Sequence, residues 1–233
     1  IASVLPLLYR CERAVIIGDE NQLKHISSIT VDEDHKLLDN LDLMENHIMW
    51  SYSQNSLFQR ADNLCLNKYK TNLLNHFRSH SDIINFANNE FYGGSLRVAT
   101  DYSKLKRIEG EQTIRWINVE GKATRPSNNR SLTNIEEANA IINELLRLKK
   151  NNYEGTIGIV TPYRAQATLI QKELHRDENL YDWFIMKRHG SINTVHLFQG
   201  DERDIMFFST VVTKNVNPSV MNFFKPNLFN VAI

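Results

Sequence analysis

A Gln-Gly-Asp-Glu turn at residues 199–202 places an amide, a glycine and a carboxylate between two apolar runs. Residues 193–196 (Asn-Thr-Val-His) lead into the turn, and residues 205–208 follow it. A glycine lets a ligand approach the backbone closely, and the neighbouring amide and carboxylate can hydrogen bond to that ligand. These residue types suit a site that holds a nucleotide sugar or a nucleic-acid backbone.

A second motif, residues 75–80 (Asn-His-Phe-Arg-Ser-His), contains an arginine ahead of a predicted helix. The guanidinium of Arg78 is always charged and fork-shaped, so it can stabilise charge on a transferring phosphoryl group without any proton transfer. The alternative is a helix-end arginine paired with a carboxylate. His76 and His80 could share a metal ion, but no third ligand is apparent, so we predict no metal site.

A third group of polar residues follows the apolar run 157–160. The hydroxyl of Thr161 and the nearby backbone amides suit a phosphate of single-stranded nucleic acid, and the ring of Tyr163 could stack on a base. Pro162 fixes the backbone between them, and Gln166 is expected to face the same end. The alternative is an ordinary helix that begins with a proline.

A fourth motif, residues 18–23 (Gly-Asp-Glu-Asn-Gln-Leu), follows the apolar run 14–17. Asp19 and Glu20 could end a Walker B strand, in which the aspartate holds Mg²⁺ and the glutamate polarises the attacking water. The alternative is a Gly-Asp turn with a solvated Gln22.

In this order, the four motifs resemble the later motifs of superfamily 1 helicases, in the branch that includes the nonsense-mediated-decay helicase and its bacterial relatives. The resemblance covers nearly the whole chain, down to Asn-Val-Ala-Ile at residues 230–233. It favours the family's Gly-Asp-x-x-Gln-Leu motif over a Walker B end. It implies that Gln22 senses the γ-phosphate of ATP, that Arg78 is an arginine finger and that Phe77 stacks near the adenine. Family members often have tyrosine at the position of Phe77.

The resemblance also implies that Gly200 permits close backbone approach and that Glu202 contacts the ATP ribose or the hinge of the cleft. Thr194 and His196 match a segment that touches the nucleic-acid strand in relatives, although a lone histidine is more often structural. The implied ligands are ATP, Mg²⁺ held mainly by residues upstream of this chain, and single-stranded nucleic acid, with DNA favoured over RNA. The expected nucleic-acid contacts are Thr161, Pro162, Tyr163, Gln166, Thr194 and His196.

Strand and helix signals alternate along the chain, which predicts an α/β fold with a parallel sheet flanked by helices. Ligands of such sheets gather at the carboxyl ends of the strands. The expected strands are 14–18, 114–119, 156–160 and 205–211. The expected helices are 1–8, one capped by Ser81 and ended by glycines 93–94, one from a Thr133–Glu136 capping box to 149–150, and 165–174.

The resemblance implies two RecA-like domains of the P-loop NTPase type. Residues 1–68 would be the end of the first domain plus a connector, and 69–233 would be most of the second. We expect residues between the first strand and position 68 to be polar and irregular. Both ends of the chain look cut, so we expect a C-terminal portion of a longer protein.

Composition narrows the class of protein. The 233 residues include 27 basic and 27 acidic side chains, so nucleic acid must be bound by a local groove instead of a global basic field. No apolar run reaches the ~20 residues of a membrane span. Cys11 and Cys65 lack metal-ligand spacing and are expected to be reduced thiols, and we expect a cytoplasmic protein.

The sequence contains no Gly-x-x-x-x-Gly-Lys-Ser/Thr phosphate loop, so we expect the chain alone not to hydrolyse ATP. The intact protein is expected to be an ATP-dependent helicase that moves along nucleic acid and unwinds it. One alternative is an ATP-independent nucleic-acid-binding or scaffold module with the same fold. An unrelated doubly wound enzyme that uses Asp19 or Asp201 would leave the motif order unexplained.

Overall fold

The computed structural model describes residues 4–23, 27–126, 131–216 and 226–232. The chain forms two compact units, Ile1–Leu73 and Leu74–Ile233, and each is described by itself. The division lies a few residues beyond the boundary that we predicted after residue 68. The assignment of these units to two RecA-like domains stays a prediction.

The first unit is helical where we expected irregular chain. Thr30 caps the helix Val31–Asn40 with a full capping box. The Thr30 hydroxyl accepts from the Glu33 backbone N–H at 3.2 Å, and the Glu33 carboxylate accepts from the Thr30 backbone N–H at 2.8 Å. Ser56 caps another helix through the Gln59 amide at 3.1 Å. The helical elements of this unit are α1 (Leu5–Tyr9), α2 (Val31–Asn40), α3 (Met44–His47), η1 (Ile48–Trp50), α4 (Leu57–Leu64) and η2 (Asn67–Tyr69).

The predicted strand at residues 14–18 is wrong. These residues are in no strand, and the side chains of Val15 and Ile17 are 88% and 83% exposed. A strand requires a hydrogen-bonded neighbour, and none of the described residues of the first unit pairs with this apolar run.

The second unit contains the predicted parallel sheet. Its strands are β3 (Ile157–Thr161), β4 (Ser191–Thr194) and β5 (Ile205–Phe208), in the order β4-β3-β5, and β3 pairs in parallel with both neighbours. Every residue of β3 is buried, as expected for the centre of the sheet. The strand that we predicted at 205–211 ends at Phe208.

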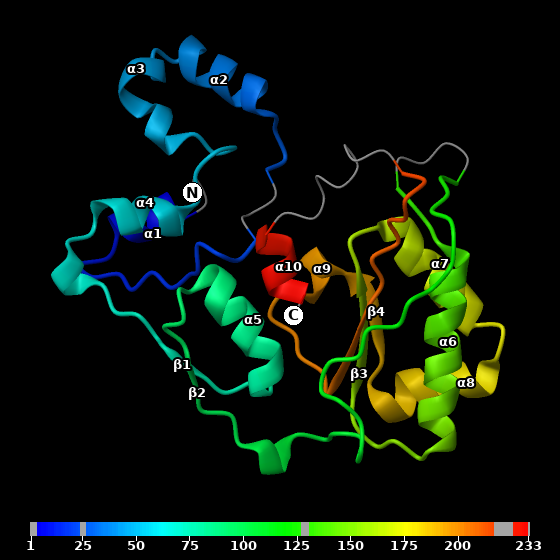
Figure 1. Cartoon of the computed structure of the whole chain (residues 1–233). Helices are drawn as coiled ribbons and strands as arrows, with labels where there is room; N and C mark the ends of the chain where they lie inside the picture. The colour runs from blue at the N-terminus through cyan, green and yellow to red at the C-terminus, as the bar shows by residue number, and fades with distance from the viewer. Residues whose placement is uncertain (1–3, 24–26, 127–130, 217–225, 233) are drawn as a thin grey trace. The chain divides into compact units, whose positions relative to one another are not determined.

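Helices cover the sheet. Figure 1 shows α6 (Ile135–Lys150), α7 (Arg164–Leu174) and α8 (Glu178–Asp182) on one side, with α9 (Val195–Phe198) and α10 (Pro226–Ala232) on the other. The π-helical turn η4 (Trp183–Lys187) follows α8. The largest core joins α6 and α7 to β3 and η4, and its fully buried side chains include Leu145, Ile157, Ile159, Ile170, Leu174 and Phe184.

A separate pair of parallel strands precedes the main sheet in the sequence. β1 (Asn75–His76) pairs with β2 (Arg97–Val98), and α5 (Ser81–Phe91) connects them. The short helix η3 (Tyr102–Lys104) follows β2. The amide of Asn230 on α10 donates to the hydroxyl of Tyr92 at 2.9 Å, so the end of the described chain packs on α5.

Two predicted caps are shifted by one residue. His80, not Ser81, caps α5, since its ring nitrogen accepts from the Asp82 amide at 3.2 Å. Asn134, not Thr133, caps α6, since its side-chain oxygen accepts from the Glu137 amide at 3.2 Å. In both cases the residue directly before the first helical residue supplies the acceptor.

The predicted strand at 114–119 is also wrong. This segment pairs with no other strand among the described residues, and Trp116 is 80% exposed. Arg115 instead forms ion pairs with Glu111 and with Glu144 on α6. Ion pairs, and not β pairing, therefore connect residues 114–119 to α6.

Two further features bear on the class of protein. Cys11 and Cys65 are free thiols, the first exposed and the second half-buried. Among the described residues, no helix is both long enough and apolar enough to cross a membrane.

Candidate functional site

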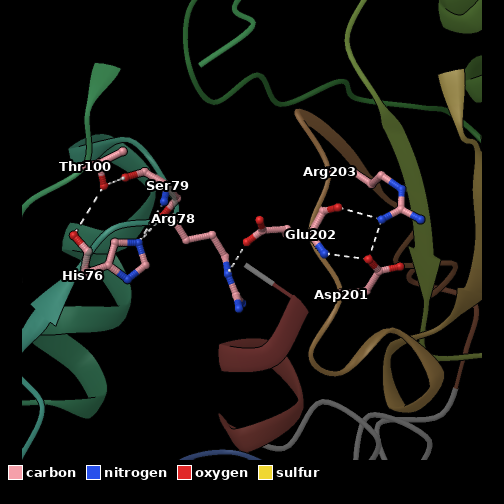
Figure 2. Close-up of polar contacts among 7 residues, drawn as sticks. All are labelled: His76, Arg78, Ser79, Thr100, Asp201, Glu202 and Arg203. Atoms are coloured by element: carbon pink, nitrogen blue, oxygen red, sulfur yellow. Dashed lines mark hydrogen bonds and ion pairs between the residues drawn. The ribbon is translucent and has the colours of Figure 1, made fainter. Parts of the chain in front are cut away.

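Arg78 projects from a tight turn between β1 and α5. His76 Nε2 accepts from the Ser79 backbone N–H at 2.9 Å and lies 2.8 Å from the Ser79 hydroxyl. The Thr100 hydroxyl, just after β2, donates to the Ser79 carbonyl at 2.8 Å (Figure 2). His76 and Ser79, which bracket Arg78 in the chain, are thus held by hydrogen bonds, while the Arg78 side chain is more than half exposed.

The guanidinium of Arg78 meets the carboxylate of Glu202. The Nε and Oε2 atoms are 2.9 Å apart, and the two side chains are 57% and 68% exposed. Two residues that we predicted separately for a nucleotide site therefore come together on one surface (Figure 2). An exposed ion pair contributes little to stability, so a ligand can replace it at small cost.

Arg203 holds the turn that carries Glu202. Its guanidinium pairs with Asp201, donates from Nη1 to the Glu202 carbonyl at 2.6 Å and donates from Nε to the His189 carbonyl at 3.1 Å. Hydrogen bonding to Arg203 lowers the pKa of Asp201. Sequence reasoning missed Arg203, although an arginine directly after an Asp-Glu pair was a usable signal.

Gly200 opens the same turn. Its φ is +87°, a backbone conformation that favours glycine, and a Cβ added there would meet no atom within 4 Å. Phe77, next to Arg78, is also exposed. We call Phe77, Arg78, Gly200 and Glu202 the Arg78–Glu202 edge; it offers an aromatic ring, a cation, open backbone and a carboxylate.

Gln22 belongs to the first unit. Its side-chain amide donates to Asp19 at 3.1 Å, and the Asn21 backbone N–H donates to the same carboxylate at 2.9 Å. The motif is therefore a turn closed by Asp19, with Gln22 exposed at its end. Its predicted sensing of the γ-phosphate stays a prediction.

The predicted stacking of Tyr163 on a base is contradicted by its burial. Only 3% of Tyr163 is exposed, and the ring packs with Ala123, Leu132 and Val211. Burial also raises the pKa of its hydroxyl. Thr161 is fully buried as well, so it offers no phosphate contact in this structure.

Gln166, the third buried member of that group, joins three parts of the unit. Its carbonyl accepts from the Asn134 backbone N–H at 2.8 Å, and its amide donates to the Asn134 carbonyl at 3.0 Å and to the Ser209 hydroxyl at 3.1 Å. The Ser209 hydroxyl in turn donates to Glu137 at 2.7 Å. Gln166 is thus a structural residue that links α6, α7 and the end of β5.

Similarity to known proteins now decides the family. A family model described as an AAA domain matches residues 53–233, and helicases match along most of the chain. The chain belongs to this AAA domain family of superfamily 1 helicases. The resemblance found in the sequence, and with it the α/β RecA-like fold class, is confirmed.

Three relatives illustrate the match. Helicase sen1 of Schizosaccharomyces pombe is 32% identical over 223 residues, which cover 90% of this chain and 12% of that protein. Helicase SEN1 of Saccharomyces cerevisiae is 27% identical over 231 residues, covering 94% and 9%. The uncharacterized ATP-dependent helicase MG140 of Mycoplasma genitalium is 26% identical over 231 residues, covering 93% and 19%. The chain therefore spans less than a quarter of the length of each of these relatives.

Three of the predicted nucleic-acid contacts remain accessible at one end of the sheet. Thr194 ends β4 directly opposite Thr161 in the parallel register, and both Thr194 and Pro162 are half-buried. His196, two residues further on, is exposed. Their role in strand binding stays a prediction.

The described part of the chain contains no group of three or more His, Cys, Asp or Glu residues placed to hold a metal ion. The rings of His76 and His80 are engaged elsewhere, the first with Ser79 and the second with Asp82.

Replacing Gln166 should destabilise the helicase chain without weakening strand binding. We expect Gln166→Ala to lower the free energy of unfolding by about 1–3 kcal/mol, because it removes the acceptor of the buried Asn134 N–H and the amide that donates to the Asn134 carbonyl and the Ser209 hydroxyl. Denaturant unfolding measures this, with Gln171→Ala, an exposed position on the same helix, as the control. Normal stability with reduced single-strand affinity would instead make Gln166 a nucleic-acid contact.

Proposed function

We propose that the intact protein is an ATP-dependent helicase, and that this chain supplies one side of its nucleotide site and part of its strand path. The Arg78–Glu202 contact at 2.9 Å carries the proposal. It joins a cation suited to phosphoryl charge and a carboxylate suited to sugar hydroxyls on one exposed edge.

The residues of the Arg78–Glu202 edge fit a nucleoside triphosphate. Arg78 would neutralise charge on the transferring phosphoryl group, and Glu202 would accept hydrogen bonds from the ribose hydroxyls. Phe77 would pack on the base, and open space beside Gly200 would admit the ligand close to the backbone. Bound ATP supplies the phosphoryl group whose transfer drives movement, and we assign no Mg²⁺ ligand to this chain.

Single-stranded nucleic acid is proposed to cross the end of the sheet near Pro162, Thr194 and His196. Hydroxyl and backbone groups contact phosphates, which DNA and RNA share. The preference for DNA therefore stays a prediction. Repeated closure on ATP and opening after hydrolysis would move the protein along the strand.

ATPase assays test the proposal. We expect the full-length protein to hydrolyse ATP faster when single-stranded nucleic acid is present and to unwind a tailed duplex. Parallel titrations with single-stranded DNA and RNA at fixed salt rank the two strands, because phosphate contacts make affinity salt-dependent. The 233-residue chain, which lacks a phosphate loop, should show no stimulated turnover.

Two outcomes would contradict this proposal. Strand binding by the full-length protein without any ATP hydrolysis would favour the scaffold module. Measurable turnover by the 233-residue chain, abolished by Arg78→Ala, would show that the chain is a complete catalyst.

A further inference from the structure

We propose that His76 and Thr100 are positioning residues for Arg78, acting through Ser79. The inference rests on the proposed role of Arg78 at the phosphoryl group. The Arg78 side chain is more than half exposed, so its position depends on how firmly the backbone of residue 78 is held.

The backbone of His76 is held by strand pairing. His76 is in register with Val98 of β2, and its carbonyl accepts from the Ala99 N–H at 2.8 Å. Its imidazole can therefore act as a fixed acceptor for the turn that follows.

The Ser79 contacts define the charge and tautomer of His76. A backbone N–H can only donate, so the Nε2 atom that lies 2.9 Å from it must carry a lone pair. The ring proton of neutral His76 is then on Nδ1, and the Ser79 hydroxyl, 2.8 Å from Nε2, is a second donor.

Thr100 completes the attachment of Ser79. Its hydroxyl donates to the Ser79 carbonyl at 2.8 Å, so the N–H, hydroxyl and carbonyl of Ser79 are all engaged. Arg78 lies between two anchored residues, His76 and Ser79 (Figure 2). Fixing its backbone matters because a misplacement of about 1 Å at a catalytic group can cost about 10²-fold in rate.

The charge state of His76 decides whether the turn is intact. Burial, followed by the positive charge of Arg78, lowers the pKa of His76 from its ordinary 6.5. Other charged groups on the neighbouring elements are Arg97 of β2, Asp101 after Thr100, Asp82 and Glu90 of α5, and Glu202, which pairs with Arg78. Protonation would set an N–H on Nε2 against the Ser79 N–H and break that contact.

The direction of the pH effect follows from this pKa. His76 is neutral and the turn is intact at pH values above the lowered pKa. As the pH falls below about 6.5 and through the lowered pKa, the turn should open and kcat should fall.

Two substitutions at His76 separate positioning from packing in the full-length protein. His76→Leu keeps a similar bulk but offers no acceptor, and we expect it to lower kcat for ATP hydrolysis at least about tenfold with little change in KM. His76→Gln supplies an amide oxygen that can accept from Ser79 and does not titrate. It should stay within about threefold of the unmodified protein and lose the acid limb of kcat.

Further variants complete the test. Thr100→Val should lower kcat several-fold, while His175→Gln, at an exposed histidine elsewhere in the unit, should change neither kcat nor its pH profile. Because His76 is proposed to act through Arg78, the double variant His76→Leu/Arg78→Ala should be no slower than Arg78→Ala alone.

Each outcome has a separate meaning. If Arg78→Ala has no effect on kcat, the proposed role of Arg78 fails. If Arg78→Ala is slow but His76→Leu keeps full kcat, the positioning inference is wrong and the role of Arg78 stands. Equal losses of kcat in His76→Leu and His76→Gln, each with the same loss of thermal stability, would reduce His76 to a packing residue and overturn the inference.

Discussion

Replacing Arg78 with alanine should lower kcat for ATP hydrolysis by the full-length protein by about 10²-fold or more. An arginine that stabilises charge developing on a transferring phosphoryl group acts mainly in the transition state, so its loss affects kcat more than ligand binding. Steady-state ATPase assays at saturating strand measure the change. Single-strand affinity without nucleotide should stay near normal.

Arg176→Ala is the matched control for Arg78→Ala. Arg176 is an exposed arginine of the same unit, paired with Glu173 and outside every motif named above. Its replacement should leave kcat unchanged. If Arg78→Ala instead hydrolyses ATP normally and binds strand weakly, Arg78 is a nucleic-acid contact.

Tyr163→Ala should lower the free energy of unfolding by about 3–5 kcal/mol, the usual cost of deleting a buried aromatic ring. The structure buries this ring against Ala123, Leu132 and Val211, so deletion leaves a cavity in the core. Thermal or denaturant unfolding of the chain measures the loss. Tyr163→Phe keeps the ring and should retain most of the stability.

Strand binding provides the contrasting measurement for Tyr163. Under conditions in which Tyr163→Ala remains folded, its affinity for single strands at fixed salt should match that of the unmodified protein. A variant that unfolds normally but loses about 1–3 kcal/mol of strand affinity would show that the ring stacks on a base in the bound state.

Much of the fold could be predicted because local patterns describe it. The alternating apolar runs of the second unit located β3, and helical spacing located α7 to within one residue. Polar residues with capping ability located the start of α6 to within one residue. These signals depend only on neighbours in the sequence.

The wrong predictions concern strand pairing and side-chain burial, which depend on residues far apart in the sequence. Residues 14–18 form an apolar run and residues 114–119 alternate, but neither segment has a pairing partner among the described residues, and strand formation depends on that partner. Thr161, Tyr163 and Gln166 lie at a strand end as expected, yet all three are buried. Tyr163 packs with Val211, and Gln166 hydrogen bonds to Asn134 and Ser209. Tertiary packing decided their direction.

The four residues of the Arg78–Glu202 edge were each predicted from the sequence, but the ion pair between Arg78 and Glu202 was not. Resemblance to a family assigned roles to both residues, and only the folded unit places one guanidinium against one carboxylate. The resemblance assigned no role to Arg203 or Thr100, which hold the two turns mainly by donating to the backbone carbonyls of other residues.

If the proposed nucleotide site is correct, the exposed Arg78–Glu202 pair would also select between competing anions. A free phosphate ion could draw the guanidinium away, but it would leave the Glu202 carboxylate beside another negative charge and without a donor. A nucleotide would satisfy both partners at once, because its phosphates would replace Glu202 at Arg78 while its sugar hydroxyls would donate to Glu202. In the proposed helicase, this pairing would discriminate against the inorganic phosphate and polyphosphate that compete for an isolated arginine.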